Sequence, residues 1–203
     1  MLIRHARPTD AEAAVPLMHS SGPEAFDYVF CARKAGEAHE FLDYAFKSGG
    51  GQFGCRNHLV ACIGNKVVGI GACFGNESRF TFADGRLIFK FFGARHAAGV
   101  ISRGLKTGTV MPPPLDWEWM IAHLAVSNEH QGAGIGRQLV RQFVQHGQRE
   151  HKKAAVLDVS AENPRAQALY ERLGFVVTGE QASILATDYG RVPNHRRMQH
   201  DLV

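Results

Sequence analysis

Three glycines within five residues mark the stretch of this chain best suited to chemistry. They lie in Gln131–Gly136, between a strand-like run that ends at Val126 and a helix-like run that starts at Ile135. Glycine lets the backbone approach a ligand closely, because no Cβ stands in the way. A helix start also presents free N–H groups and the positive end of the helix dipole. The stretch predicts a site for phosphate or another anion, although the glycines alone would also fit an ordinary strand-to-helix turn.

A second chemical candidate is Tyr170, which belongs to a helix with a clear start signal. Asn163 and Pro164 are the residue types preferred at the N-cap and first position of a helix. Ala166 and Tyr170 are one helical turn apart, so they share the inward stripe of that helix. From this position alone we interpret Tyr170 as a core tyrosine with a satisfied hydroxyl, unless another feature of the chain gives that hydroxyl a role.

The elements that must position these residues alternate between strands and helices. We predict a strand over 117–126, a helix over 135–144 and an apolar strand over 154–159. Upstream, residues 58–63 and 66–74 form a predicted hairpin around Gly64-Asn65. This order indicates an α/β (or α+β) fold with a mixed sheet and helices on both faces.

The N-terminal third is predicted to be mainly helical. A short strand over 2–6 precedes a capping box, with Thr9 at the N-cap and Glu12 at N3 of the first helix. Two further helical runs cover 24–30 and 35–46. Residues 76–115 are too many for a structureless connection, so we predict a helical insertion there that covers a site or a partner surface; extra core packing is the alternative.

Composition narrows the classes of protein to which the chain can belong. Its 203 residues fit a single domain, 1–203, with 45% hydrophobic and 21% charged residues. A net charge of +4 suits a small anionic ligand but is weak support for nucleic acid, and no apolar run is long enough to span a membrane. The N-terminus lacks an apolar secretory segment, and the four cysteines form no CxxC pair. We therefore expect a cytoplasmic protein with no metal, no nucleic-acid partner and no membrane partner.

Taken together, these segments resemble the GNAT superfamily of acyl-CoA-dependent N-acetyltransferases. The resemblance covers about residues 117–180 and rests on Leu124–Val126, the Gln131–Gly136 loop and the unit Asn163–Phe175, in that order and spacing. It implies a mostly antiparallel central sheet with a splayed strand pair that holds acetyl-CoA. It also implies transfer of the acetyl group to a primary amine by direct attack in a ternary complex, without a metal, by a monomer or a homodimer.

The resemblance also implies roles for individual residues. The glycine loop would hold the pyrophosphate of coenzyme A, a bulged strand near Leu124–Val126 would bind the pantetheine arm, and Tyr170 would protonate the leaving thiolate. Asn163 would both cap its helix and reach the pantetheine. The residues implied to bind the cofactor are Leu124, Ala125, Val126, Gln131, Gly132, Ala133, Gly134, Ile135, Gly136, Arg137, Asn163, Ala166 and Tyr170.

The group that takes the proton from the amine is left open. Glu118 lies on the key strand with the same parity as Leu124 and is our first choice, alongside a water relay. His123 has the opposite parity, although a bulge could re-aim it.

Two other functions compete with this interpretation. One is an acyl-CoA-binding sensor or interaction module of the same fold, without turnover. The other is a dinucleotide-dependent oxidoreductase, with Asp158 as the acidic residue after the glycine loop. In that case the third glycine falls one residue early, with Arg137 in its place.

Overall fold

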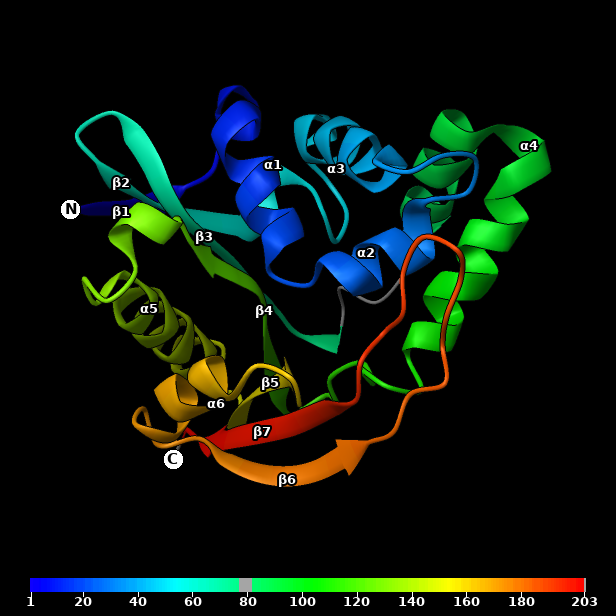
Figure 1. The fold of residues 1–203 in the computed structure, drawn as a ribbon. Helices are drawn as coiled ribbons and strands as arrows, with labels where there is room; N and C mark the ends of the chain where they lie inside the picture. Colours follow the sequence, from blue (N-terminus) through cyan, green and yellow to red (C-terminus); the bar gives the residue numbers. More distant parts are fainter. Residues whose placement is uncertain (77–81, 203) are drawn as a thin grey trace.

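A single sheet runs through the computed structural model of the chain, which describes residues 1–76 and 82–202 (Figure 1). Within these residues the sheet has seven strands in the order β1-β2-β3-β4-β5-β7-β6. The strands are β1 (Leu2–His5), β2 (His58–Ile63), β3 (Lys66–Phe74), β4 (Glu118–Val126), β5 (Ala154–Ser160), β6 (Val176–Gln181) and β7 (His195–Asp201). Only β4 and β5 run parallel, and every other neighbouring pair is antiparallel. The predicted mixed, mostly antiparallel sheet is confirmed.

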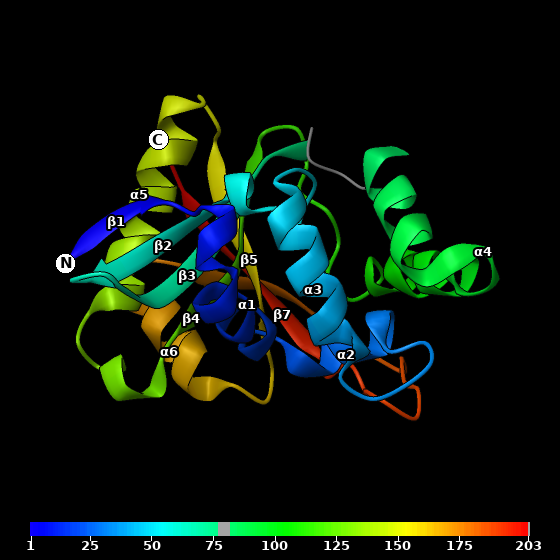
Figure 2. The ribbon, with the colours of Figure 1, turned by 90° about the horizontal axis from the view of Figure 1, so that it is seen from above.

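Helices cover both faces of this sheet. They are α1 (Ala11–Ser20), α2 (Pro23–Phe30), α3 (Glu37–Ser48), α4 (Phe82–Thr107), α5 (Ile135–Arg149) and α6 (Pro164–Glu171). Figure 1 shows α1 to α3 on one side of the sheet and α5 with α6 on the other. Helix α4 lies within the 76–115 stretch, packs on α2 and α3, and is interrupted at Gly93, whose φ is 70° (Figures 1 and 2).

Each face of the sheet has its own apolar core, as alternation along the strands requires. On the side of α1 to α3 the core includes Met18, Phe41, Leu42, Phe46 and Ile70. On the side of α5 and α6 it includes Leu139, Phe143, Tyr170, Phe175 and Met198. The two cores fix the helices that carry the predicted chemistry against the central strands. Among the described helices, none is long and apolar enough to cross a membrane.

Local signals predicted most elements well, with one clear exception. The hairpin forms as expected, with Lys66 paired to Ile63 across Gly64-Asn65. The capping box at Thr9 and Glu12 is wrong. A short 3₁₀ helix, Pro8–Asp10, precedes α1, and Asp10 accepts the backbone N–H of Arg7 at 2.7 Å while it also pairs with Arg4. An ion pair to a residue six positions earlier, in β1, thus determines how the chain enters this helix.

Strand β4 carries a bulge opposite Gly71 of β3. Ile70 pairs with Ala125 and Ala72 with Ala122, so His123 and Leu124 together face the single residue Gly71. A Cβ at position 71 would lie 2.7 Å from the Phe143 ring and 3.2 Å from Leu124 Cδ1. The bulge therefore packs closely only because Gly71 has no side chain.

Replacing Gly71 by alanine tests this packing. The added methyl would overlap the fully buried ring of Phe143, and overpacking of this kind typically costs about 1–3 kcal/mol. We expect the free energy of unfolding in urea to fall by that amount. Gly50→Ala is the matched control, because Gly50 is exposed and its Cβ would meet nothing within 4 Å. Equal urea midpoints for the two variants would contradict the packing argument.

Candidate active site

The parallel strands β4 and β5 separate after their first three paired residues. Glu118–Met120 pairs with Ala154–Val156, and the pairing between these strands extends no further. A cavity of about 730 Å³, here called the cleft, is lined by the diverging halves, Leu124–Val126 and Asp158–Ser160. This volume is in the range of small-molecule and cofactor pockets. The predicted splayed strand pair is therefore present.

The glycine loop closes one end of the cleft and leads into α5. Gly132 and Gly134 have φ values of 83° and 79°, a left-handed conformation that side chains rarely adopt. Gln131 Nε2 donates to Asn128 Oδ1 at 2.9 Å, which ties the loop to the short turn before it. Because α5 begins at Ile135, its first backbone N–H groups have no partner within the helix and suit an anion.

The structure brings nearly all the predicted cofactor residues together around the cleft. Those that line it are Leu124, Ala125, Val126, Gln131, Gly132, Gly134, Ile135, Gly136, Arg137, Asn163, Ala166 and Tyr170. Ala133 does not line it. Segments from β4, the glycine loop and α6 thus meet around a single space.

Helix α6 forms another wall of the cleft, next to the end of the glycine loop. Asn163 caps it as predicted, with Oδ1 accepting the Ala166 N–H at 3.0 Å. Tyr170 is 8% exposed and lines the cleft. Burial raises the pKa of the Tyr170 hydroxyl to about 12, so the hydroxyl keeps its proton at neutral pH. A protonated phenol at this place is suited to donate a proton.

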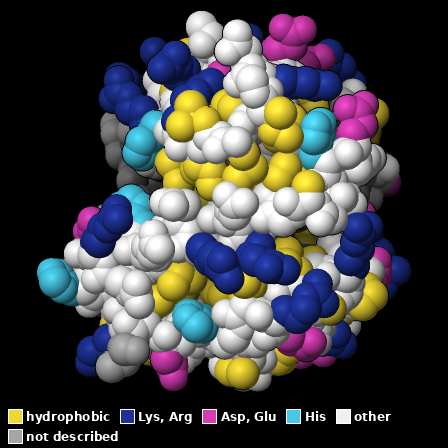
Figure 3. All heavy atoms as spheres, turned by 90° about the vertical axis from the view of Figure 1, so that its left-hand side faces the viewer, with side chains coloured by type: hydrophobic (Ala, Val, Ile, Leu, Met, Phe, Trp, Pro, Cys, Tyr) yellow, Lys and Arg dark blue, Asp and Glu magenta, His cyan; other side chains and the backbone are white. Residues whose placement is uncertain are grey.

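Both cationic and anionic side chains line the cleft, and the anionic ones are Glu24, Asp158 and Glu162. Arg137, Arg165 and Arg172 all line the cleft and are exposed. Figure 3 shows Lys and Arg side chains across this face of the protein, with hydrophobic side chains between them. Three arginines beside a row of free N–H groups suit a ligand that carries several phosphates. In the described part of the chain, no group of three or more His, Cys, Asp or Glu is arranged to hold a metal ion.

Glu118 lies away from the cleft, at the start of β4. It is 5% exposed, and its Oε2 accepts the backbone N–H of Leu115 at 2.9 Å. Arg197 Nη1 lies 3.7 Å from the same oxygen, and Arg197 also bonds both carboxylate oxygens of Asp158, at 3.0 and 2.7 Å. Glu118 thus belongs to an ion cluster within the sheet, a geometry that suits a structural role better than proton transfer.

A second cavity of about 640 Å³, here called the aromatic cavity, adjoins the cleft. The two share five lining residues: Ser21, Gly22, Ala25, Asp158 and His195. On β4, residues 120–123 line the aromatic cavity and residues 124–126 line the cleft. The strand passes from one cavity to the other at its bulge.

His123 occupies that crossing point in an unusual backbone conformation. Its φ is 55°, which is uncommon for a residue with a side chain, although histidine adopts it more often than most. The imidazole is half-buried and lies 5.6 Å, between ring centroids, from both Phe26 and Phe53. The bulge re-aims His123, so that it lines the aromatic cavity despite its opposite parity to Glu118.

His58, which the sequence did not single out, fixes the tautomer of His123. His58 Nδ1 lies 2.9 Å from the carbonyl oxygen of Gly54, so Nδ1 carries the hydrogen. His58 Nε2 lies 3.1 Å from His123 Nδ1. Burial lowers the pKa of His58 to about 4 and that of His123 to about 3, so both rings are neutral. His123 Nδ1 must then donate, and its Nε2 keeps an unprotonated lone pair.

Comparison with known proteins identifies the family. The model of the acetyltransferase (GNAT) family matches residues 24–175, three quarters of the chain. A probable N-acetyltransferase family 8 member 5 of Mus musculus is 39% identical over 89 residues, which are 41% of this chain and 39% of that protein. N-acetyltransferase 8B of Homo sapiens is 43% identical over 58 residues, 29% of this chain and 26% of its own. The chain thus spans well under half the length of these curated relatives.

Solved acetyltransferase structures share the fold. A crystal structure of an acetyltransferase superposes with a TM-score of 0.66 at 20% identity, covering all of both chains. A putative acetyltransferase from Salmonella typhimurium, solved with its cofactor acetyl-CoA, gives a TM-score of 0.58 at 19% identity, covering 100% of this chain and 94% of that one. At such identities the likeness establishes the fold.

The pair formed by buried His58 and half-buried His123 predicts a sensitivity of the fold to mild acid. In the unfolded chain both rings take up a proton near the ordinary pKa of 6.5. In the folded protein His58 takes up a proton only near pH 4 and His123 only near pH 3. The unfolded state therefore binds more protons in that window, so the stability present above pH 6.5 is lost as the pH falls. The slope approaches about 1.4 kcal/mol per pH unit for each histidine.

Urea unfolding between pH 7.5 and about 5 measures this slope, in a window above the ordinary pKa of carboxylates. His58→Gln removes the fully buried ring of the pair, so the stability of this variant should depend less steeply on pH. The comparison uses slopes rather than absolute stabilities, so it holds even if the variant is less stable. Identical slopes in the two proteins would exclude the pair as the source.

Proposed function

The chain belongs to the acetyltransferase (GNAT) family, and from this membership we propose that it transfers an acetyl group from acetyl-CoA to a primary amine. The observation that carries the proposal is the junction of two cavities at the β4 bulge. A cleft suited to a phosphate-bearing ligand adjoins an aromatic cavity, the lining passes from one to the other along β4 at the bulge, and five residues of other elements line both. Two substrates can then be held together, which suits direct attack in a ternary complex.

The cleft fits coenzyme A by the chemistry of its lining. Backbone N–H groups at Gly132, Gly134 and Gly136 would bind the pyrophosphate, and the arginines of the cleft would balance phosphate charge. The exposed edge of Leu124–Val126, which β5 leaves unpaired, would bind the amides of the pantetheine arm. A backbone N–H of this segment would also stabilise the oxyanion of the tetrahedral intermediate.

The reaction needs one group that donates a proton and one that accepts a proton. The amine nitrogen bonds to the carbonyl carbon and loses a proton, and the carbon–sulfur bond breaks to release a thiolate. Tyr170, protonated and on the cleft wall, would give the thiolate its proton.

His123 is the better candidate to accept the proton of the amine. Its Nε2 lone pair lies on a ring that lines the aromatic cavity beside the cleft, whereas Glu118 lines neither cavity. A neutral imidazole of low pKa is a weak base toward a free ammonium group. It suffices for the far more acidic N–H of an amine already bonding to the carbonyl carbon. The hydrogen bond to His58 would hold the ring in this tautomer throughout.

Tyr170→Phe tests the proton donor, because it removes only the hydroxyl and keeps the ring packing. Turnover, measured as amine-dependent release of free thiol from acetyl-CoA, should fall about 10²–10⁴-fold. The dissociation constant for acetyl-CoA should change little, since the cradle of N–H groups is intact. Tyr28→Phe is the control, because Tyr28 is also buried but lines neither cavity. Full turnover in a folded Tyr170→Phe protein would return Tyr170 to a core role.

His123→Asn and Glu118→Gln together test the proton acceptor. Asparagine tolerates the positive φ and can keep a donor toward His58, but it lacks Nε2. We expect thiol release to fall about 10²–10⁴-fold in His123→Asn. Glu118→Gln keeps the acceptor for the Leu115 N–H and should leave turnover within a few-fold. The opposite ranking would assign the role to Glu118, and full activity in both variants would indicate a water relay.

The same assay separates catalysis from the alternative of a non-catalytic acyl-CoA sensor. Binding of acetyl-CoA without thiol release for any amine would favour the sensor. For the oxidoreductase alternative, Asp158 would have to bind a ribose, but both of its carboxylate oxygens already accept hydrogen bonds from Arg197.

A further inference from the structure

The aromatic cavity has an unusually apolar wall for a site beside a charged ligand. Among the described residues, five phenylalanines line it: Phe26, Phe30, Phe41, Phe53 and Phe74. Helix α4 supplies the facing wall with Leu87, Ile88, Val100, Ile101, Gly104 and Leu105. At about 640 Å³ the cavity could bury an apolar group well beyond a single methyl. Such a group would gain roughly 25 cal/mol for each Å² of apolar surface that it buries.

The charges of the lining differ from those of the cleft. Among the described residues that line the aromatic cavity there is no Lys or Arg, and of its two carboxylates Asp84 belongs to this cavity alone, whereas Asp158 also lines the cleft and is paired with Arg197. A carboxylate on the bound molecule would therefore be desolvated without a cation to pair with it. The cavity thus disfavours free amino acids relative to the amines that share their side chains.

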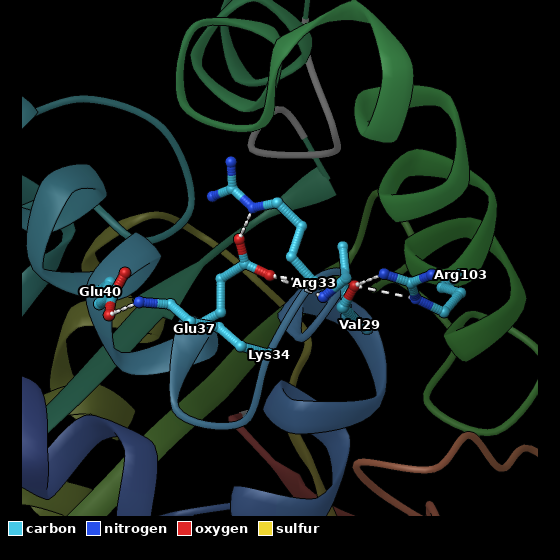
Figure 4. A network of polar contacts seen from close by, with 7 residues as sticks. Val29, Arg33, Lys34, Glu37, Glu40 and Arg103 are labelled. Carbon is cyan, nitrogen blue, oxygen red and sulfur yellow. Dashed lines mark hydrogen bonds and ion pairs between the residues drawn. The ribbon is translucent and has the colours of Figure 1, made fainter.

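Two arginines hold the α4 wall in place. Arg103 donates from Nε and Nη2 to the carbonyl oxygen of Val29, at 3.0 and 2.8 Å, joining α4 to the end of α2 (Figure 4). Arg33 pairs with the fully buried Glu37 and lies over the rings of Phe91 and Phe92, at 5.8 and 5.6 Å. Glu37 also accepts two backbone N–H bonds in the turn after α2, each at 2.8 Å. The cavity is thus built from braced elements and is formed before a ligand binds.

The geometry points to the aromatic cavity as the acceptor site for a primary amine with a bulky apolar body, aromatic or branched aliphatic, and no carboxylate beside the amine. This inference rests on the proposed acetyl transfer, because it places the amine beside His123 and the body against α4. Helix α4 then determines which amines are accepted.

Matched small molecules test the class of acceptor. Phenethylamine, phenylalanine and ethylamine share the amino group but differ in the apolar body or the carboxylate. We expect kcat/KM for thiol release from acetyl-CoA to be at least about 10-fold higher for phenethylamine than for either of the others. Calorimetric titration of the same compounds into the protein with CoA, which donates no acetyl group, should give the same ranking of affinities.

A cavity-filling variant links the preference to α4. Gly104 lines the aromatic cavity, and its Cβ would meet only Val29 Cγ1 at 3.8 Å, so Gly104→Leu places a side chain in the cavity without backbone strain. Ala98→Leu is the matched control on the same helix, because Ala98 is exposed and lines neither cavity. Gly104→Leu should lower both kcat/KM and the binding affinity for phenethylamine by at least about 10-fold, and Ala98→Leu should not.

The outcomes distinguish the two proposals. Two results would overturn the proposed class of acceptor but leave acetyl transfer in place. One is an equal kcat/KM for the three amines, and the other is an unchanged kcat/KM and affinity for phenethylamine in Gly104→Leu. Phenethylamine binding that is weakened by Gly104→Leu, but with no thiol release from any amine, would support the ligand class and overturn acetyl transfer. Preferential turnover of phenylalanine would also overturn the inference, because it would require a cationic partner in the cavity.

Discussion

One extra residue in β4 determines how the two cavities of this protein are related. Because His123 and Leu124 together face Gly71, the strand changes the side to which its residues point in the middle of the sheet. Residues before the bulge line the aromatic cavity, and those after it line the cleft. The same irregularity turns His123 toward the space where the two cavities meet. It can exist because Gly71 leaves room for the Phe143 ring that packs beneath it.

The parting of β4 and β5 supplies the other half of the arrangement. Once β5 turns away after Val156, the backbone of Leu124–Val126 has no strand on that side, and the glycine loop and α6 enclose the gap. Three arginines line this cleft, whereas the described residues that line the neighbouring cavity include five phenylalanines and no Lys or Arg. The charge of each lining thus matches a different kind of ligand, which reduces competition between the two for the same site.

The sequence predicted what depends on neighbouring residues and missed what depends on distant ones. The glycine loop, the Asn163 cap, the hairpin and the order of elements follow from local patterns, and the structure contains each of them. The capping box at Thr9 is wrong for a more local reason, because Asp10 pairs with Arg4, six positions earlier, and accepts the backbone N–H of Arg7. For Glu118, the alternation of side chains along the strand was a sound argument about the side of the sheet to which the carboxylate points. It could not reveal that Arg197, far along the chain, holds the carboxylate.

His58 and His123 show the same limit most clearly. They are 65 positions apart, and nothing beside either one marks it as half of a pair. Parity placed His123 away from the site, and the bulge that reverses this depends on a glycine in another strand. Whether the cofactor residues act as predicted stays a prediction, although the structure gathers them around one cleft.

The bond between Arg103 and the carbonyl of Val29 also bears on how this protein could diversify. The hydrogen bond is accepted by a main-chain oxygen, so replacing the Val29 side chain does not remove it. The bond also does not involve the other residues of the cavity wall. Helix α4 can therefore stay attached while the side chains that face the cavity change one by one. A lineage built on this scaffold could explore new acceptors by single mutations, without first having to rebuild the wall that selects them.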